Sequence, residues 1–416
     1  MDISKIQKIA IVGSGIAGLT AAHLLHPRYQ ITMYEANDYI GGHTHTIDVV
    51  RQDKVYAVDT GFIVFNEKTY PHFCALLKSL GVEKKLSNMS FSYSQQPYGL
   101  EYGGDSLNGI FAQRRNLLNP RFYVFLQDIH CFYKCAKQFL VNPDATISLD
   151  DWLHSQSLGN MAIDHLIKPM ASAIWSTPLD QVGHIPAQFI LDFYANHGLL
   201  EHSNRPPWYV VSGGSRSYVD ALVKPLKDCI RLNSPVLNIR RSLRPVTIVT
   251  KDTEQKYDAV VLACHSPQAL ALLEQPSTDE HTILSSIHYS PNIATLHTDT
   301  RAMPARKSAR ASWNFQQHQG GQTSLTYYMN LLQTINSDAH FLVSINQPAI
   351  DPDQVIASFE YEHPLYNQSS VHAQQRHDQI NGQNRTFFTG AYWGNGFHEA
   401  GVRSSIDALK SFNCSL

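Results

Sequence analysis

Hydrophobic and polar positions near the N-terminus follow the pattern of a strand, a turn, a helix and a second strand. Residues 7–12 (QKIAIV) form a short, β-branched run that is typical of a buried parallel strand. The apolar periodicity of the following LTAAHLL predicts a helix, which Pro27 closes. A second strand is predicted in ITMYE, which ends at Glu35. This order of elements indicates an α/β fold with a parallel sheet.

Three later segments are predicted to return to the same sheet. Residues 234–239 (SPVLNI) and 257–263 (YDAVVLA) have the composition of buried strands, and residues 387–390 (FFTG) are predicted to form the last strand. Residues 76–175 are predicted to be mostly helical, and residues 286–345 mix alternating strand patterns with loops. The chain is therefore expected to combine one α/β sheet with a second region of helices and strands.

Composition places the chain among ordinary globular proteins and argues against several functional classes. Of its 416 residues, 43% are hydrophobic and 16% are charged, so it can bury a sizeable core. The formal net charge is −2 without a long run of like charge, which argues against nucleic-acid binding. No apolar stretch is long enough to predict a spanning helix, and the N-terminus lacks a signal-peptide pattern. We expect a cytoplasmic protein and leave open a peripheral contact with the inner face of the membrane.

Cysteine and histidine usage indicates neither disulfides nor a metal centre. The six cysteines are scattered along the chain without a C-x-x-C pair, which is typical of free thiols in a reducing compartment. Histidine is abundant, at 21 residues, and His43 and His45 form the closest pair. No third ligand follows this pair at the spacing of a metal site, so we expect no metal.

The turn between the first strand and the helix has the sequence GSGIAG (residues 13–18). Gly13 permits a tight turn, Gly15 lets backbone N–H groups approach a pyrophosphate, and Gly18 lets the helix pack closely on the strand. The N-terminus of the helix adds positive potential for the phosphates. Glu35, seventeen residues beyond Gly18, is placed to accept the ribose hydroxyls of an adenosine and would repel a 2′-phosphate. The sequence therefore predicts a dinucleotide site that does not select NADP.

Two further glycine turns favour FAD over NAD. Gly41 and Gly42 begin six residues past Glu35, where a second turn suits a ligand that runs back past the first strand. A predicted strand within residues 55–66 (VYAVDTGFIVFN) then reaches Asp-Thr-Gly-Phe, where Gly61 permits close backbone approach to a flat group. The spacing of the three turns is typical of a ligand longer than NAD, with a flavin at its far end.

Nine segments, spread from the first strand to residue 401, together carry a family resemblance: GSGIAGL, EANDYIGGHTHT, VDTGFIVFNEKTYP, IWSTP, PPWYVVSGGSRSYV, YDAVVLACHSPQALALL, ASWNF, TYYMNLLQ and GAYWGNGFHEAG. The set in this order resembles the flavin-containing amine oxidase superfamily, which also includes protoporphyrinogen oxidase and phytoene desaturase. Within it, the chain is most similar to a bacterial group described as predicted NAD/FAD-binding proteins and linked to modified fatty-acid synthesis.

The resemblance implies a two-domain α/β (α+β) architecture with a Rossmann-like FAD-binding domain and a discontinuous, amine-oxidase-like substrate domain. The FAD-binding domain is expected over residues 1–75, 208–285 and 375–416, and the substrate domain over residues 76–207 and 286–374. Monoamine-oxidase-type relatives attach flavin through a cysteine in the C-terminal segment. Residues 386–401 contain no cysteine, so FAD is expected to bind noncovalently.

The glycine turns and the resemblance together give the residues expected to contact FAD. They lie in the first turn, at the end of the second strand, in the two later turns, in two returning segments and at the start of the last helix. We predict Gly13, Ser14, Gly15, Ile16, Ala17, Gly18, Glu35, Ala36, Gly42, His43, Thr44, Gly61, Phe62, Val236, Gly390, His398, Glu399 and Ala400.

The C-terminal segment GAYWGNGFHEAG is expected to close over the flavin. Gly394 and Gly396 permit a turn close to the cofactor, and the helix beginning near Glu399 is expected to aim its N–H groups at the flavin, where negative charge develops on reduction. Related flavoproteins often have an acid after the last strand's glycine, and this chain has Ala391 there. The position after His-Glu is Ala400, which leaves Glu399 as the nearest carboxylate.

The expected activity is that of an FAD-dependent oxidoreductase that takes a hydride from a lipophilic substrate at flavin N5. Only one dinucleotide fingerprint is present and no C-x₄-C pair follows it, which argues against disulfide reductases and NADPH-driven monooxygenases. Electrons are therefore expected to leave to oxygen, a quinone or another acceptor. The resemblance implies desaturation of an acyl chain at an allylic position. A flavin-dependent double-bond isomerase, an amine oxidase and a noncatalytic FAD-binding protein stay open as alternatives.

Amine oxidation is disfavoured by two departures from the family pattern, the missing cysteine of the C-terminal segment and a missing lysine. Monoamine-oxidase-type relatives carry a lysine that hydrogen-bonds through water to flavin N5, and the corresponding residues 288–299 contain none. His197 and His398 are the candidate catalytic bases, since histidine titrates near neutral pH. Each of them also suits the alternative of a hydrogen-bonded structural histidine.

The first part of the substrate region is unusually aromatic, with eleven Phe and Tyr residues between positions 91 and 139. One interpretation is that these rings fill the core of a helical cap. The other is that some of them line a tunnel for a long apolar substrate. Arg114 and Arg115 stand nearby, either at a tunnel mouth where they meet a carboxylate or phosphate headgroup, or as a solvated basic turn.

Overall fold

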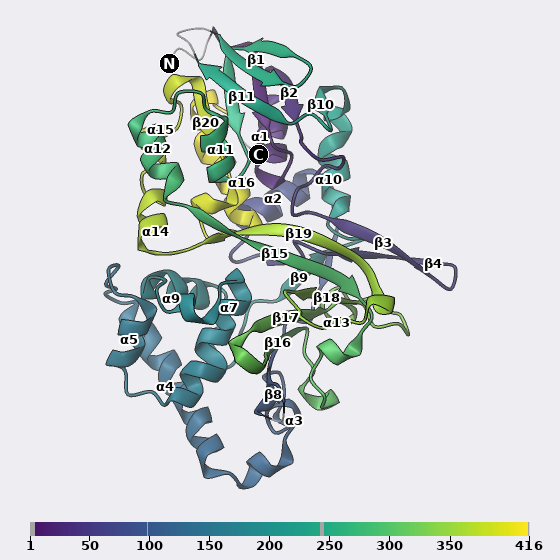
Figure 1. Cartoon of the computed structure of the whole chain (residues 1–416), viewed down its shortest axis with the longest axis vertical. Helices are drawn as coiled ribbons and strands as arrows, with labels where there is room; N and C mark the ends of the chain where they lie inside the picture. Colours follow the sequence, from purple (N-terminus) through teal and green to yellow (C-terminus); the bar gives the residue numbers. More distant parts are fainter. Residues whose placement is uncertain (1–4, 98, 242–244, 415) are drawn as a thin grey trace.

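A five-stranded parallel sheet forms the centre of the upper part of the computed structural model (Figure 1), which describes residues 5–97, 99–241, 245–414 and 416. The strand order is β10-β2-β1-β14-β20, and all neighbours pair in parallel. The strands are β1 (Lys8–Val12), β2 (Gln30–Tyr34), β10 (Ile230–Arg231), β14 (Ala259–Leu262) and β20 (Thr386–Phe388). The sheet therefore unites segments from both ends of the chain.

Both faces of the parallel sheet are covered, which explains why β1 and β14 are continuous hydrophobic runs. Ile9 and Ile11 of β1 pack into one core with α1 (Ile16–Leu25), α2 (Pro71–Ser79), α10 (Arg216–Val223) and α16 (His398–Ala408). Ala10 and Val12 pack on the opposite face with α11 (Ser266–Leu272), α12 (Thr278–Ser285), β11 (Val236–Arg241), β12 (Val246–Thr250) and β13 (Glu254–Tyr257). The last three strands form an antiparallel sheet, and α14 (Gln368–Gln374) and α15 (His377–Ile380) flank α12.

A seven-stranded sheet organises the rest of the molecule, in the order β19-β15-β18-β17-β16-β7-β8. Its strands are β7 (Phe91–Gln95), β8 (Glu101–Gly103), β15 (His288–His297), β16 (Trp313–Gln317), β17 (Thr323–Tyr328), β18 (Leu342–Ile345) and β19 (Val355–Leu365). The two long strands β15 and β19 run between the upper and lower parts of the molecule (Figure 1). Helices share one core with this sheet, and they include α4 (Pro120–Phe139), α5 (Leu149–Ser155), α7 (Lys168–Trp175) and α9 (Ala187–Asn196).

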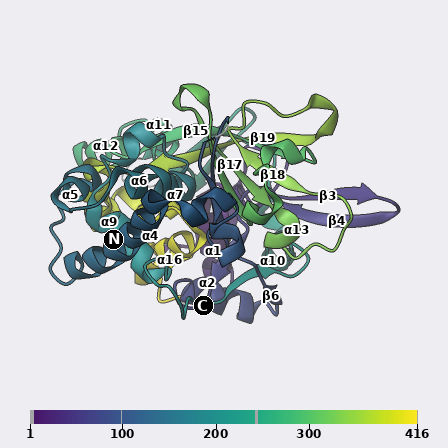
Figure 2. The same cartoon turned by 90° about the horizontal axis from the view of Figure 1, so that it is seen from below.

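Two small strand groups connect these regions. The strands β5 (Val64–Asn66), β9 (Trp208–Val211) and β6 (Lys84–Leu86) form a short antiparallel sheet. The hairpin of β3 (Thr46–Arg51) and β4 (Lys54–Asp59) projects from the side of the molecule, and α1 lies beside α16 (Figure 2). The short helix α13 (Met329–Leu332) packs next to β17 and β18.

The structure confirms the expected mixed α/β class and the strands within residues 257–263 and 387–390, which are β14 and β20. Two expectations are wrong in part. Residues 84–103 hold β6, β7 and β8 rather than helix, because the alternation of FSYSQ has the period of a strand. The strand expected at 234–239 begins at Val236 and joins the antiparallel sheet, since its side chains alternate in exposure and do not form a buried run. The domain limits stay a prediction.

Candidate functional site

The first glycine turn lies between the carboxyl end of β1 and the start of α1. Gly13 has a φ of +101°, and a Cβ atom there would lie 2.9 Å from the carbonyl oxygen of Ala263. A Cβ at Gly18 would overlap the carbonyl oxygen of Gly13, so the approach of α1 to β1 requires glycine. A Cβ at Gly15 would meet no atom within 4 Å. The turn is thus tightly packed at two glycines and open at Gly15, the N-cap of α1, where the first N–H groups of the helix lack intrahelical partners.

Glu35 closes this turn from the end of β2. Its buried carboxylate accepts hydrogen bonds from the backbone N–H and the hydroxyl of Ser14 at 2.9 and 2.6 Å, and from the N–H of Asn37 at 2.9 Å. The N–H of Ser234 donates to the carbonyl oxygen of Glu35 at 2.9 Å. The segment that leads to Val236 therefore lies beside the end of β2 and its exposed neighbour Ala36, where the sequence predicts the adenosine end of the ligand.

The second and third glycine turns lie against the first. Gly42 has a φ of +58°, and a Cβ there would lie 3.2 Å from Cα of Gly15. The carbonyl oxygen of His43 accepts the N–H of Phe62 at 2.8 Å. A Cβ at Gly61 would overlap that same oxygen, so the third turn also requires glycine. The structure therefore brings together three turns that are separated in sequence.

His43 lies in a cluster of histidine and tyrosine rings. Its ring centroid is 5.1 Å from Tyr361, 5.7 Å from His363 and 5.8 Å from His265. Burial and the two neighbouring histidines lower the pKa of His43 to about 3, and burial lowers the pKa of His363 to about 4. Both rings are therefore uncharged at neutral pH. Nε2 of His43 is buried and has no hydrogen-bond partner within the described part of the chain, so it is available to a ligand.

His398, the first residue of α16, joins the second and third turns. Its Nε2 lies 2.7 Å from the hydroxyl of Tyr218 and 3.0 Å from Oγ1 of Thr44, and these two hydroxyls also hydrogen-bond to each other. The ring stacks on Phe62 with centroids 3.4 Å apart. Burial, followed by the proximity of His43, lowers the pKa of His398 well below its ordinary value. His398 is thus a neutral group, hydrogen-bonded through Nε2, at the far end of the glycine turns.

The packing of α16 on α1 places residues 401–405 of α16 against the first turn of α1. The hydroxyl of Ser405 donates to the carbonyl oxygen of Ala17 at 2.8 Å, and a Cβ at Gly401 would lie 2.8 Å from Cγ2 of Ile16. Gly390, just after β20, donates its N–H to the hydroxyl of Ser404 at 2.9 Å. The predicted residues from the two ends of the chain therefore meet in one place.

The side chain of Glu399 is engaged elsewhere, at the N-terminus of α2. Its carboxylate accepts the backbone N–H groups of His72 and Phe73 at 3.2 and 3.0 Å and lies 2.6 Å from Nδ1 of His72. Of Glu399, therefore, only the backbone is free to make the contact with FAD that the sequence predicts. Ala400 faces Gly394, because a Cβ at Gly394 would lie 2.8 Å from Cβ of Ala400. The two small residues pack so closely that an acid at position 400 would have little room.

We expect Glu399→Gln to lower the free energy of unfolding of the apoprotein by about 1 kcal/mol. The neutral amide loses the attraction of a negative charge to the N-terminus of α2 and the charge-assisted bond to His72. Urea unfolding measures the change, with Glu360→Gln on the exposed side of β19 as the control. Equal stability of both variants would show that the cap contributes nothing.

His197 lies outside this cluster, at the end of α9. Its ring stacks on Phe193 and on Trp208, with centroid distances of 3.8 and 5.7 Å, and Nδ1 lies 2.9 Å from the carbonyl oxygen of Phe193. Burial lowers the pKa of His197 to about 4. These contacts fit the alternative of a hydrogen-bonded structural histidine.

Asp59, which the sequence does not single out, forms a buried network behind the third turn. Its carboxylate accepts hydrogen bonds from the hydroxyls of Thr46 and Ser215 at 2.6 and 2.7 Å, and from the side-chain amide of Gln333 at 2.7 Å. Its backbone N–H donates to the same amide group at 2.9 Å. Burial raises the pKa of Asp59 to about 6 in spite of these donors. The network ties β4 to the loop after β9 and to the end of α13.

Asp59 is expected to make stability depend on pH between about pH 4 and 6. The folded state holds the proton more tightly than the unfolded chain does, so stability falls as the pH rises through this window, by up to about 1.4 kcal/mol per pH unit. Urea unfolding of FAD-saturated protein across the window measures the slope. Asp59→Asn should remove this contribution. Asp48→Asn is the matched control, because the hydrogen bond to Arg216 holds the pKa of Asp48 below its usual value. An unchanged slope in Asp59→Asn would contradict the assignment.

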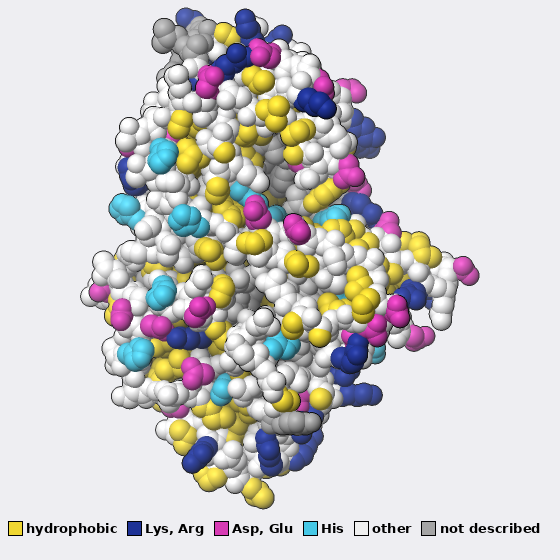
Figure 3. Space-filling view, viewed as in Figure 1, with side chains coloured by type: hydrophobic (Ala, Val, Ile, Leu, Met, Phe, Trp, Pro, Cys, Tyr) yellow, Lys and Arg dark blue, Asp and Glu magenta, His cyan; other side chains and the backbone are white. Residues whose placement is uncertain are grey.

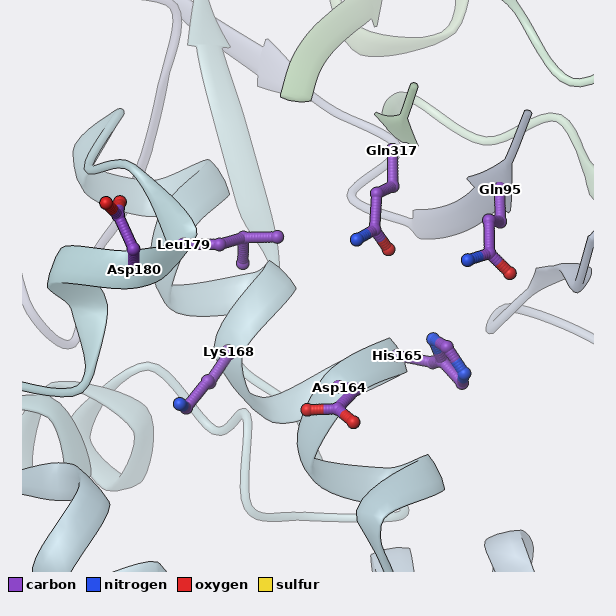
Figure 4. Close-up of a pocket in the computed structure, with 7 residues that line it drawn as sticks. All are labelled: Gln95, Asp164, His165, Lys168, Leu179, Asp180 and Gln317. Atoms are coloured by element: carbon purple, nitrogen blue, oxygen red, sulfur yellow. The ribbon is translucent and has the colours of Figure 1, made fainter. Parts of the chain in front are cut away.

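A pocket of about 370 Å³ lies away from the glycine turns, at the ends of β7 and β16 and beside α7 (Figure 4). It is lined by Gln95, Asp164, His165, Lys168, Leu179, Asp180 and Gln317. Six of these seven residues have polar side chains and none is Phe, Tyr or Trp, unlike the lining expected of an aromatic tunnel. Tyr102, Phe122 and Phe125 are buried in the core around the seven-stranded sheet. The structure therefore supports the core-filling interpretation for these aromatic residues.

Comparison with models of known protein families shows which family this chain belongs to. The family model described as flavin containing amine oxidoreductase matches residues 16–341, which is most of the chain. The chain belongs to this family. Membership confirms the family resemblance carried by the sequence motifs, and the description of the family agrees with the expected flavin chemistry.

Individual relatives of this chain have diverse names. Coproporphyrinogen III oxidase of Staphylococcus aureus is 23% identical over 293 residues, which cover 62% of this chain and 60% of the relative. The 1-hydroxycarotenoid 3,4-desaturase of a Flavobacterium species is 35% identical over 150 residues, which cover 33% and 28%. The chain thus spans less than two thirds of the curated relatives it matches. The solved structure of a CLA-producing fatty acid isomerase from P. acnes superposes with a TM-score of 0.70 at 16% identity, covering 99% and 100% of the two chains, and shows the shared fold.

Several residues at this site escape the sequence prediction. His265 follows the carboxyl end of β14, and since ligands of parallel α/β sheets bind at that edge, its position gives a usable signal. His363 and Tyr361 come from β19, and Tyr218 comes from α10. Tyr218 lies in the segment PPWYVVSGGSRSYV, which carries the family resemblance but does not by itself indicate a contact at this site, and no motif marks His363 or Tyr361. Only the packing of distant elements brings these three residues to the glycine turns.

Proposed function

We propose that the chain is an FAD-dependent oxidoreductase that desaturates a lipophilic substrate beside an existing double bond. The observation that supports this most is the continuous path from Glu35 through Gly15 and Gly42 to His398. It starts at a buried carboxylate suited to a ribose, crosses the open N-terminus of α1 and ends at a closed aromatic site. An extended dinucleotide with a flavin at one end requires these features in this order.

Three observations fit FAD on this path. The open space at Gly15 leaves room for a pyrophosphate in front of α1. The unpartnered Nε2 of His43 provides a buried hydrogen-bonding atom close to the second turn. The N-terminus of α16 would stabilise negative charge on the flavin. We propose noncovalent attachment, because residues 386–401 contain no cysteine.

The histidine and tyrosine rings around the proposed flavin end are uncharged, and the carboxylate next to them, that of Glu362, already lies 3.0 Å from Nδ1 of His265. Burial keeps His43, His363 and His398 neutral, and it raises the pKa values of Tyr361 and Tyr218 far above neutral pH. An ammonium group brought into such surroundings would lose its hydration without gaining a counter-charge. A hydrocarbon chain has no such cost. These surroundings therefore favour a lipophilic substrate over a protonated amine.

FAD, when bound, supplies the hydride acceptor. The residues of the chain would orient the donor C–H, exclude water and take up the second hydrogen as a proton. Of the two candidate bases, we propose His398, because it lies with Thr44 and Phe62 at the end of the path. Its low pKa makes it a neutral, weak base that releases the proton again readily. His197 has no contact with this group of residues and is not proposed for this step.

Two alternative reactions remain within the same chemistry. Amine oxidation is the activity in the family's description, but neither β15 nor β19 contains a lysine of the kind that the monoamine-oxidase-type relatives use. A double-bond isomerase would use the same neutral site without net electron transfer. The mass of the product and the state of the flavin distinguish these reactions.

The test uses FAD-loaded protein under anaerobic conditions with a polyunsaturated fatty acid and, in parallel, with putrescine. Desaturation should bleach the visible flavin bands and yield a product two hydrogen atoms lighter. A product of unchanged mass without bleaching would mean isomerisation, and bleaching by the amine alone would refute the proposed substrate class.

His398→Gln is expected to slow the bleaching at least about a hundredfold, on the scale of lost general-base catalysis. His197→Gln is the matched control, since it replaces a second buried histidine that lies outside the path, and it should retain the wild-type rate. Equal rates in the two variants would remove His398 from the mechanism. Flavin content per protein, measured from the absorption spectrum, verifies that both variants are loaded.

A further inference from the structure

One end of the molecule concentrates exposed apolar side chains. It is formed by α3 (Leu107–Ile110), the 3₁₀ helix η2 (Arg114–Leu118) and the first turns of α4, at the lower end of Figure 1. Five of the thirteen exposed large hydrophobic side chains of the described residues lie here, with Leu118 exposed by 90% and Leu107 by 76%: Leu107, Leu117, Leu118, Tyr123 and Val124. Such a cluster on a protein surface marks an interaction site.

Cationic side chains surround these apolar residues. The 3₁₀ helix η6 (Lys307–Ala309) packs against α3 and β8 and adds its cations to those of the neighbouring stretch. Together they are Arg114, Arg115, Arg121, Arg306, Lys307 and Arg310. The acids nearby are Glu101, which pairs with Arg306 at 2.5 Å, and the exposed Asp105. We call residues 107–124 and 306–310 the tip. It carries an excess of positive charge on a chain whose formal net charge is −2, and Figure 3 shows the mixture of apolar and basic side chains at this end.

A pocket of about 280 Å³ opens within the tip, lined by Gln113, Arg114, Arg115 and Arg306. The guanidinium of Arg114 donates to the carbonyl oxygen of Phe111 at 2.7 Å and to the side chain of Asn108, so it is held in place. No carboxylate in the described ranges pairs with Arg115. Guanidinium groups bind phosphate oxygens through paired, charge-assisted hydrogen bonds. The pocket therefore fits a phosphate that arrives next to apolar chains.

We propose that the tip docks on the surface of a bilayer that contains anionic phospholipids, with Leu117 and Leu118 among the acyl chains and a lipid phosphate in the arginine pocket. Exposed leucines with adjacent arginines match the apolar and anionic layers of such a surface. No helix within the described residues is long and apolar enough to cross a bilayer, so the proposed contact is peripheral. A nucleic acid would satisfy the arginines but would leave the leucines in water.

The position of the tip would also suit delivery of a lipophilic substrate. The side-chain amide of Gln113 donates to the carbonyl oxygen of Gly99 at 2.8 Å, and the N–H of Gly99 donates to the carbonyl oxygen of Gln95 at 3.0 Å. Gln95 lines the pocket of Figure 4, so that pocket lies next to the docking surface. The docking itself rests on the surface of the tip alone and does not depend on the proposed reaction.

The test is sedimentation of FAD-loaded protein with vesicles of phosphatidylcholine alone and of phosphatidylcholine mixed with phosphatidylglycerol. Binding is expected only to the mixed vesicles and should weaken at high salt. Leu118→Asp should reduce partitioning at least about tenfold. Arg115→Glu should reduce it at least about fivefold. The matched controls are Val141→Asp, just beyond the C-terminal end of α4 and 85% exposed in the wild type, and Lys251→Glu in the exposed turn between β12 and β13.

The four variants change exposed side chains, so all should keep the wild-type flavin spectrum and unfolding midpoint. The two control variants should bind vesicles as the wild type does. Equal partitioning of Leu118→Asp and Val141→Asp, equal binding to neutral vesicles, or stronger binding to duplex DNA would each overturn the proposal. Vesicle binding is measured without substrate, so its failure would leave the proposed reaction untouched, and absence of turnover would leave the docking result untouched.

Discussion

Replacing Gly15 by valine is expected to give a stably folded protein that no longer retains FAD. Gly15 has φ −66° and ψ 179°, a conformation that valine adopts without strain. A Cβ there would meet no protein atom within 4 Å, so the ligand-free chain gains no steric overlap. The side chain would instead occupy the space proposed for the pyrophosphate in front of α1. The substitution therefore acts on the ligand and not on the fold.

Two measurements on the purified variant check this result. The free energy of unfolding of the apoprotein should stay within about 0.5 kcal/mol of the wild type, and the ratio of flavin to protein after incubation with FAD should fall to background. Gly104→Val is the matched control, because a Cβ at Gly104 has only one contact, at 3.4 Å from the carbonyl oxygen of Phe91, and that residue lies outside the path. Retention of FAD by Gly15→Val would show that the cofactor does not cross the first turn.

Gly18→Ala is expected to destabilise the fold itself, whereas Gly15→Val affects only the binding of FAD. The added methyl group would overlap the carbonyl oxygen of Gly13, and it would lie 3.0 Å from the carbonyl carbon of Gly13 and 3.2 Å from Cβ of Ala263. Alanine gains about 1 kcal/mol in helix propensity over glycine. The overlap is with backbone, so no side-chain rotation relieves it, and overpacking of this kind costs about 1–3 kcal/mol or more. We expect a net loss of about 2 kcal/mol.

Urea unfolding of the apoprotein measures the effect of Gly18→Ala without interference from the cofactor. Gly104→Ala provides the reference for adding one methyl group where the space is ordinary. If Gly18→Ala proved as stable as the wild type, α1 could move away from β1 at little cost. The prediction that Gly15 is required for FAD binding and Gly18 for packing of the helix would then be wrong for Gly18.

The predictable part of the site is local in sequence. The first turn, the helix that follows it and Glu35 lie within thirty residues. At the key positions of this segment, a single physical requirement restricts the type of residue. Glycine at positions 13 and 18 is required by the neighbouring backbone, so the spacing alone indicates the geometry. The last strand and the last helix can also be predicted from the sequence, because β20 is a short apolar run and α16 follows a glycine-rich turn.

The remainder depends on contacts between distant segments. His363 and Tyr218 reach the glycine turns only through the packing of β19 and α10, and Glu399 turns its carboxylate to α2 because the N-terminus of that helix lies within reach. The sequence does not predict the strands within residues 84–103, for a different reason. Their alternation extends over only a few residues, next to a long helical segment, and is completed by pairing with β16 far along the chain.

The contact of α16 with α1 has a consequence for how the protein is made. Gly401 and Ser405 pack on Ile16 and Ala17 but are synthesised almost four hundred residues after them. A nascent chain can form the first glycine turn but lacks the helix that completes the proposed cofactor path. Capture of FAD is therefore expected to follow synthesis of α16, so the protein must survive as an unloaded form, and its exposure to proteases during that interval would depend on the supply of the cofactor.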